Sequence, residues 1–330
     1  MGTIIRYRSN RGNVKFILGF GVYAGGSFTN RADKVDYVSE TTSYKSSYNL
    51  SQGRQNLGST STSMFGLYCG GIISNWTYVT RADRANYVSE TTAYRSSYNL
   101  TRTKGRLVGV GTKNFGLFFG GWRDTGTSQG PISANVTDRA NYTTETTSTA
   151  TNYNMASARH SMASAGNLDF GLIIGGGFGN NDVMTTCERA NYSAGTISTV
   201  SSYNLSIART RLAGAGNLTM AIFMGGMTSS GLAPPNHPII YYRESDKTDY
   251  IAETTSAASS FNSTTRRRYL CGAGNNNFGI FSGGHEHPNT YSRSDKADYI
   301  AGITSYVSSY NLSEGSSGLA GASNSNPGSL

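Results

Sequence analysis

The chain has 330 residues and a formal net charge of +9, but only 14% of its residues are charged, and it contains 41 glycines and 6 prolines. A single hydrophobic core rarely serves a chain of this length, so the sequence predicts several domains or an architecture that grows by repetition. No stretch approaches the roughly 20 apolar residues of a membrane-spanning helix, and the first residues lack the pattern of a secretion signal, so we expect neither membrane insertion nor export by that route.

A repeated unit organises the chain. Residues 31–50 and 81–100 are identical at 15 of 20 positions. Further copies are marked by a pair of glycines after a short apolar run, and the second glycine of each pair is Gly26, Gly71, Gly121, Gly176, Gly226 or Gly284. The intervals of 45 to 58 residues suit units of four short strands. The sequence therefore predicts six such units.

Each unit contains four predicted strands. The first is a run of small residues, which suits an inner strand where backbones approach closely. The second is the apolar run that ends in the glycine pair and has the length of a strand buried on both faces. The third carries an acid, a base, a small residue, Asn or Asp, and Tyr, and its Tyr ring can pack on the neighbouring sheet. We expect a Thr-rich turn at the ETTS motif and the fourth strand at SSYNL.

A basic residue recurs five positions after the Asn of the SSYNL motif. The six residues at this position are Arg54, Lys104, Arg159, Arg209, Arg267 and, in the last unit, Ser316. A cation in the same place of successive units predicts a structural role, in which it pairs with backbone carbonyls or with an acid of the next unit.

The order of these segments resembles the kelch type of β-propeller over residues 17–323, with Tyr or Phe where the outer strand of kelch units usually has Trp. Residues 318–322 repeat the inner-strand pattern with no apolar strand after them, whereas the apolar strand at residues 17–26 has a poor inner strand before it. We therefore predict an all-β, six-bladed propeller at residues 13–330, with four antiparallel strands per blade. A C-terminal strand completes the first blade and removes exposed strand edges, and residues 1–12 form an N-terminal arm.

The connections between second and third strands vary most in length, and all of them lie on one face of the predicted ring. Variable loops on a rigid scaffold are the default place for recognition, and binding surfaces favour aromatic residues and Arg. The candidate ligand-binding or partner-binding residues in these loops are Trp76, Tyr78, Trp122, Arg123, Phe178, His237, Tyr241, Tyr242, His285 and His287. The alternative is that these loops fold over the ring and pack on themselves.

Most of the excess positive charge lies outside the repeated positions. It includes Arg6, Arg8, Arg11 and Lys15, which are candidate docking residues of the N-terminal arm. Such charge could meet an acidic polysaccharide, a lipopolysaccharide or the acidic face of another protein, and the alternative is a merely solvated positive surface.

The sequence offers no catalytic set. His285 and His287 stand two residues apart but have no evident third ligand, so we expect no metal and no cofactor. Cys69, Cys187 and Cys271 occupy different places in different repeats, which predicts buried apolar side chains rather than a disulfide framework. We therefore expect a protein that is not an enzyme.

The combined wording DRANY, TTS, NLSIART-RLAGAGN and FGLFFGG has a narrower resemblance, to repeat proteins among the virion components of tailed phages, particularly those that infect cyanobacteria. It implies a structural protein of a tail fibre, baseplate or surface decoration, assembled in the host cytoplasm with other virion proteins and with a role in attachment. We expect its variable loop face to bind a host glycan or a neighbouring subunit. No nucleic acid partner is expected, because half of the 22 tyrosines occupy repeated structural positions. A free-standing carbohydrate-binding lectin and a propeller hydrolase or oxidase are the alternatives.

Overall fold

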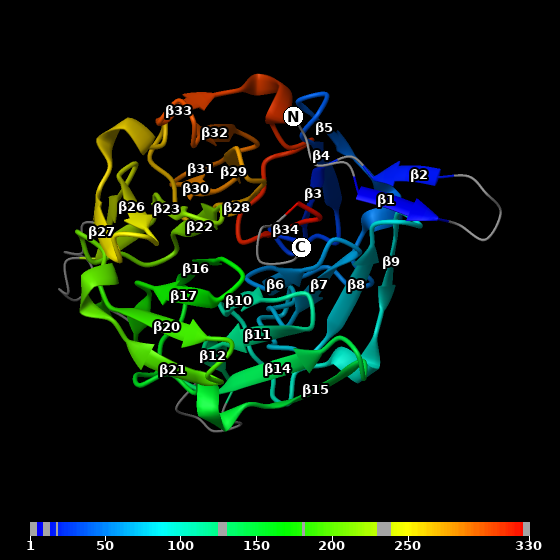
Figure 1. Ribbon diagram of the computed structural model, residues 1–330, viewed down its shortest axis with the longest axis horizontal. Helices are drawn as coiled ribbons and strands as arrows, with labels where there is room; N and C mark the ends of the chain where they lie inside the picture. Colours follow the sequence, from blue (N-terminus) through cyan, green and yellow to red (C-terminus); the bar gives the residue numbers. More distant parts are fainter. Residues whose placement is uncertain are drawn as a thin grey trace.

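The computed structural model describes residues 5–8, 14–17, 19–124, 131–179, 182–229 and 239–325. Within these residues, six four-stranded antiparallel sheets surround a central axis as the blades of a β-propeller (Figure 1). This is the all-β, six-bladed architecture that the repeats predict. In each blade the first strand faces the axis and the fourth lies at the outer edge of the ring.

The strands of the blades are short and nearly constant in length. Blade 1 contains β34 (Ala320–Ser323), β3 (Phe20–Ala24), β4 (Ala32–Asp36) and β5 (Thr41–Tyr44). Blade 2 contains β6 (Gly58–Ser61), β7 (Phe65–Cys69), β8 (Ala82–Asn86) and β9 (Thr91–Tyr94). Blade 3 contains β10 (Val108–Gly111), β11 (Phe115–Phe119), β14 (Thr137–Asn141) and β15 (Thr146–Thr149).

The second half of the ring repeats the same plan. Blade 4 contains β16 (Ala163–Gly166), β17 (Phe170–Ile174), β20 (Cys187–Asn191) and β21 (Thr196–Thr199). Blade 5 contains β22 (Ala213–Gly216), β23 (Met220–Met224), β26 (Ser245–Asp249) and β27 (Thr254–Ala257). Blade 6 contains β28 (Cys271–Gly274), β29 (Phe278–Ser282), β32 (Ser294–Asp298) and β33 (Ile303–Tyr306).

Short hairpins occupy the connections between second and third strands in blades 3 to 6. They pair β12 (Trp122–Arg123) with β13 (Ile132–Ser133), β18 (Gly177–Phe178) with β19 (Asp182–Val183), β24 (Met227–Ser229) with β25 (Ile239–Tyr241), and β30 (His285–Glu286) with β31 (Asn289–Thr290). Because the strands are antiparallel, these hairpins and the links between blades project from the same face of the ring. We call it the loop face.

The C-terminal segment closes the ring as predicted. Strand β34 pairs with β3, and the register sets Ala320 opposite Ala24 and Ser323 opposite Gly21. At the other end of the chain, β1 (Ile5–Arg8) pairs with β2 (Val14–Ile17) in a separate two-stranded sheet. The segment outside the blades therefore extends past residue 12 to Ile17, because the backbone of β2 bonds to β1 and not to a blade.

The outer strand differs from the prediction. The Thr-rich segment forms the fourth strand, whereas the SSY segment forms a single 3-10 turn in each blade: η1 (Ser46–Tyr48), η2 (Ser96–Tyr98), η3 (Thr151–Tyr153), η4 (Ser201–Tyr203), η5 (Ser259–Phe261) and η6 (Ser308–Tyr310). The turn comes earlier because Asp36 Oδ1 accepts hydrogen bonds from the backbone N–H groups of Val38 and Ser39, at 2.9 and 3.0 Å. An Asp or Asn that bonds the backbone in this way makes a tight turn, and the β-branched threonines after it then extend as a strand.

Aromatic packing joins neighbouring blades. The Tyr that follows the third strand sets its ring edge against the Phe that begins the second strand of the preceding blade, with centroid distances of 5.1 Å for Tyr87 and Phe20 and 5.0 Å for Tyr142 and Phe65. Edge-to-face pairs of this kind stabilise beyond their buried area. The predicted contact between sheets is confirmed. Cys69, Cys187 and Cys271 are free and buried, as expected.

The repeated basic residue makes a buried ion pair in each of five blades. It reaches the acid of the third strand of the blade whose inner strand it precedes: Arg54 with Asp83, Lys104 with Asp138, Arg159 with Glu188, Arg209 with Asp246, and Arg267 with Asp295. The four arginines also donate to backbone carbonyls of that blade. The predicted structural role is confirmed, and a buried charge with these partners is both paired and hydrogen-bonded.

Replacing Asp246 by Asn should strongly destabilise the fold. It leaves the guanidinium of Arg209, whose side chain is 0% exposed, without its counter-charge. Breaking a buried pair in this way costs about 3–5 kcal/mol. Glu253→Gln is the matched control. Glu253 forms an ion pair with Arg189 at 2.8 Å at the outer edge of the ring, and its side chain is 59% exposed. Exposed ion pairs of this kind contribute less than about 1 kcal/mol. Urea unfolding of both variants checks this, and equal losses would contradict it.

Candidate functional site

A closed circle of backbone hydrogen bonds surrounds the axis at the loop face. Its six members stand just before the inner strands: Asn56, Arg106, Ser161, Arg211, Tyr269 and Gly318. The N–H of each donates to the carbonyl of the equivalent residue in the preceding blade, at 2.6 to 2.9 Å. All six have φ between 54° and 69°. Such values are uncommon outside glycine and tend to persist where the surrounding structure enforces them, often at functional sites.

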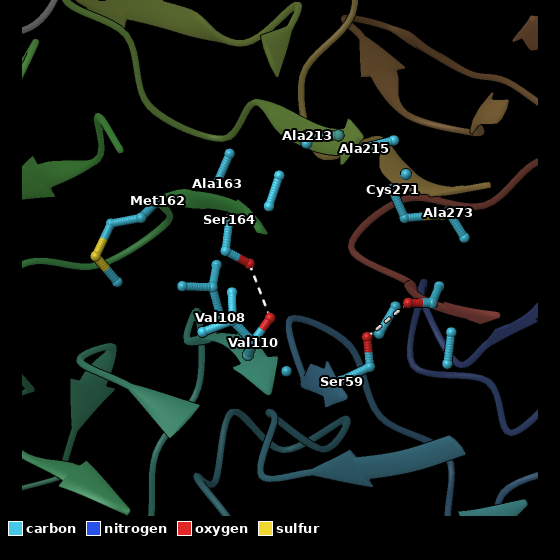
Figure 2. A pocket seen from close by; sticks show the side chains of 18 of the residues that line it. Ser59, Val108, Val110, Met162, Ala163, Ser164, Ala213, Ala215, Cys271 and Ala273 are labelled. Carbon is cyan, nitrogen blue, oxygen red and sulfur yellow. Dashed lines mark hydrogen bonds between the residues drawn. The ribbon is translucent and has the colours of Figure 1, made fainter. Parts of the chain in front are cut away.

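The circle of hydrogen bonds forms the rim of an axial cavity of about 190 Å³. Below the rim the wall consists of the inner strands, whose small side chains include Ala163, Ala213 and Ala273 (Figure 2). The wall hydroxyls of Ser59 and Ser164 donate to carbonyls of adjacent blades, at 2.7 and 2.9 Å. The wall is therefore neutral, and the charge of this region lies at the rim.

Arg211 and Arg268 converge beside the rim. Their Nη1 atoms lie 3.0 and 2.9 Å from the same atom, the sulfur of Met227. The guanidinium of Arg211 also lies 4.8 Å from the ring centroid of Tyr269, and that of Arg268 lies 5.2 Å from the ring of Tyr241. Two cations thus share one soft, polarisable neighbour and two aromatic faces.

Arg106 lies close enough to Arg211 for its charge to add to the effect of burial in lowering the pKa of Arg211. The guanidinium of Arg106 lies 4.1 Å from the ring of Trp122, and that ring meets the imidazole of His160 edge-on at 4.6 Å. His160 Nε2 lies 2.9 Å from the carbonyl oxygen of Gly179, so Nε2 carries the proton, and Nδ1 accepts from the hydroxyl of Ser161 at 3.1 Å. We call Arg106, Arg211 and Arg268 the arginine cluster.

The electrostatics of the cluster reflect positive charges held close together. Burial lowers the pKa of Arg211 to about 10, and the charges of Arg106 and Arg268 act in the same direction against the nearby tyrosines. Burial, followed by the charges of Arg106 and Arg211, lowers the pKa of His160 to about 4. Within the part of the chain that the structure describes, none of the three arginines forms an ion pair with a carboxylate. At neutral pH the site therefore holds three positive charges and a neutral imidazole.

Four of the predicted site residues border this cluster. Trp122 and Tyr241 contact Arg106 and Arg268. Burial raises the pKa of Tyr78, while the nearby charge of Arg106 lowers it and that of Asp124 raises it. His285 pairs with Arg268 through the backbone, and its pKa is lowered by burial and then by the charge of Arg268.

The other predicted residues lie elsewhere. Trp76 is 62% exposed and sets its ring against Phe28 at 5.3 Å, and Phe178 is exposed in β18. Tyr242 lies 5.9 Å from the buried guanidinium of Arg209, which is a structural position. Arg123 follows Trp122 in β12, while Arg6, Arg8 and Lys15 belong to the β1–β2 hairpin, and His237 and Arg11 lie outside the described residues.

The His285 and His287 pair shows no metal site in the described residues. The two rings are 6.2 Å apart, and His285 Nδ1 contacts the hydroxyl of Thr290 at 3.2 Å. No group of three His, Cys, Asp or Glu side chains in the described part of the chain could hold a metal ion.

Sequence reasoning missed the arginine cluster because it lies in the links and not in the variable loops. The links appear uniform, with a base in five of the six units and a Leu or Met three residues later in all six. The two positions between them nevertheless vary. The second holds Asn56, Arg106, Ser161, Arg211, Tyr269 and Gly318, and the first holds Gln55, Gly105, His160, Thr210, Arg268 and Ser317. These two variable positions inside an otherwise constant segment are the signal that could have pointed to the cluster, because they hold Arg106, Arg211 and Arg268.

No protein-family model and no curated protein matches the chain. Among solved structures, the chain is similar to one titled "Structure of YjhT", with a TM-score of 0.71 and 12% identity over 87% of this chain and 94% of that one. At this identity the likeness shows the propeller fold alone. No helix in the described residues is long and apolar enough to span a membrane.

Arg211→Met should leave the free energy of unfolding unchanged or raise it. Arg211 is a mostly buried cation with two like charges nearby and no acidic partner among the described residues, so its loss relieves repulsion. Binding residues often carry such a stability cost. Arg209→Met, two residues earlier, is the matched control and should lose about 3–5 kcal/mol because Asp246 is left unpaired. Urea unfolding of both variants measures the difference, and a comparable loss in Arg211→Met would mean that its role is structural.

Proposed function

We propose that this protein is a non-enzymatic structural protein of a tailed-phage virion, in a tail fibre, baseplate or surface decoration, and that its loop face binds an acidic glycan of the host surface. The observation that supports the binding role is the arginine cluster at the rim of the axial cavity. Three guanidinium groups with no carboxylate partner among the described residues form an incomplete set of charges, which an anionic ligand would complete.

The chemistry of the cluster suits a ligand with carboxylate, sulfate or phosphate groups. Guanidinium groups bind such oxyanions with paired N–H donors, more specifically than an ammonium group does. The rings of Trp122, Tyr241 and Tyr269 stand beside the arginines and offer apolar faces to a sugar ring. Aromatic side chains together with a few charged groups are the usual components of a specific small-ligand site.

The opposite face supports the part of the proposal that concerns docking. The turns between third and fourth strands carry Ile251, Ile300 and Val38 at 81%, 81% and 57% exposure in three consecutive blades, 5, 6 and 1. Contiguous patches of exposed apolar side chains mark interaction sites, and the proposal takes these three side chains as parts of one docking surface. In the proposed arrangement the propeller docks through this face, with the basic residues of the N-terminal segment as a second contact, and turns its loop face outwards.

The assignment to a phage virion rests on the resemblance of the repeated sequence motifs to those of virion proteins. Under this proposal the protein assembles in the host cytoplasm with other virion subunits, and it has neither a cofactor nor a nucleic acid partner. A free-standing lectin would use the same loop face without belonging to a particle.

Binding of a sulfated polysaccharide should depend on the arginine cluster. The triple variant Arg106→Gln, Arg211→Gln, Arg268→Gln should lose at least about tenfold in affinity by isothermal titration calorimetry, because charge-assisted bonds contribute about 1.5–3 kcal/mol each. The control Lys45→Gln, Arg95→Gln, Arg102→Gln removes the same net charge from exposed positions and should keep most of the affinity. Between about pH 7 and pH 9 the affinity should stay constant, since the pKa of Arg211 is about 10, that of His160 is about 4, and burial lowers that of His285 below its usual value. Equal losses of affinity in the two triple variants would mean that binding depends on the net charge of the protein and not on the arginine cluster.

Intact particles should carry the protein. An antibody against the chain, used in electron microscopy of phage particles from an infected culture, should label one defined part of the tail or capsid surface. Particles without the protein, together with glycan binding by the isolated chain, would favour the lectin.

A further inference from the structure

The ion-pair position of blades 4, 5 and 6 is a cradle of three oxygen acceptors. In blade 6, Arg267 Nη1 donates to the carbonyls of Gly283 and Arg293, both at 2.7 Å, while Nη2 donates to the carboxylate of Asp295. Arg159 and Arg209 make the same three contacts in blades 4 and 5. The three oxygens therefore lie within the span of one planar guanidinium, around a space that takes a single positive charge.

Blade 1 retains the acceptors but not the cation. The register of β3 and β4 sets Asp33 opposite Tyr23, just as Asp295 stands opposite Phe281 in blade 6. The backbone N–H of Gly25 bonds the carbonyl of Arg31 at 2.9 Å, as Gly283 bonds Arg293. The cradle of blade 1 thus consists of the carbonyls of Gly25 and Arg31 and the carboxylate of Asp33.

The residue at the position of the cation is Ser316. It is buried, and its hydroxyl donates to the carbonyl of Gly25 over a long 3.4 Å. Asp33 is only 6% exposed. Its carboxylate accepts a hydrogen bond from the backbone N–H of Ser313, also at 3.4 Å, and the Ser313 hydroxyl is a second donor. In the other blades an acid this deeply buried has a cation in the cradle.

Arg31 does not take the place of the missing cation. Its Nε forms an ion pair with Glu314 at 2.9 Å, an Nη atom donates to Ser313, and the guanidinium lies 4.1 Å from the ring of Tyr44. In blade 2 the equivalent Arg81 likewise lies on the ring of Tyr94, at 3.9 Å, while Arg54 fills the cradle. The two roles are therefore separate.

We propose that the cradle of blade 1, formed by Asp33, the carbonyls of Gly25 and Arg31 and the hydroxyl of Ser316, binds a potassium ion. Buried carboxylates require a paired charge or full hydrogen bonding, and one carboxylate balances one monovalent ion. Carbonyl, carboxylate and hydroxyl oxygens are hard donors. A divalent ion would keep one uncompensated positive charge in this buried place, because the cradle supplies a single carboxylate.

The size of the cradle favours potassium over sodium. In blade 6 it is spaced for nitrogen-to-oxygen contacts of 2.7 Å, which suits the larger monovalent ion better than the smaller one. Gly25 and Arg31 flank the loop between β3 and β4, whereas Ser316 lies just before β34. A potassium ion at this place would join the two ends of the chain and stabilise ring closure.

Thermal unfolding of the full chain tests the site directly. At constant ionic strength, replacing tetramethylammonium chloride by KCl should raise Tm by about 2 °C or more and saturate, with a smaller rise in NaCl, because a ligand that binds only the folded state stabilises it by mass action. Ser316→Arg supplies the missing cation covalently, so it should have a raised Tm without KCl and no potassium dependence. Asp33→Asn should also lose the potassium dependence.

Ser317→Arg is the matched control, because it adds the same charge one residue away and should keep the response to KCl. Equal Tm values of the unaltered protein in KCl and tetramethylammonium chloride would overturn the proposal. A response to KCl that persists in Asp33→Asn would overturn it as well, and that variant decides the question even if Ser316→Arg does not fold.

Discussion

The buried ion pair between the inter-blade link and the third strand is the interaction on which the rest of the structure depends. It fixes the link at the same point in five blades, with a guanidinium or ammonium group held by a carboxylate. The member of the hydrogen-bonded circle then follows two residues later, as Arg211 follows Arg209. A buried pair of this kind adds little net stability over apolar packing, but it tolerates only one arrangement of its partners. Its contribution here is therefore positional.

The fold is six-fold in its architecture and asymmetric in its chemistry. The residues that make the repeats recognisable have structural roles. They are the glycine pair, the ion pair, the Tyr that packs on the neighbouring blade and the Asp or Asn that turns the chain. Chemistry specific to this protein has to come from positions where the copies differ. The position that forms the hydrogen-bonded circle differs between the copies, for example Gly318 and Arg211. The position of the buried cation holds a serine in one copy, at Ser316. Both departures lie in segments that are otherwise constant.

The sequence allowed the architecture to be predicted because each unit repeats a complete set of local signals. Period, glycine pairs and the C-terminal inner strand together specify six blades and their closure. The outer strand was predicted wrongly because Thr-Thr-Ser favours turns and strands alike, and the hydrogen bonds of Asp36 to the backbone decide between them. The loop face and its residues Trp122 and Tyr241 could be predicted in part. The convergence of Arg106, Arg211 and Arg268 could not, because it depends on left-handed backbone at the rim and on contacts between blades about 50 residues apart.

The rim concentrates features that cost free energy. Five residues other than glycine adopt positive φ there, at about 1–3 kcal/mol each, and two guanidinium groups face the same sulfur atom. The fold can hold this arrangement because every member of the circle is bonded to both neighbours, so none can relax unless the ring opens. The strength of closure in blade 1 therefore bears directly on the site. Blade 1 is the only one of the six described blades in which a serine replaces the buried cation. Whatever stabilises the cradle of Asp33 consequently also helps to hold the arginine cluster in place.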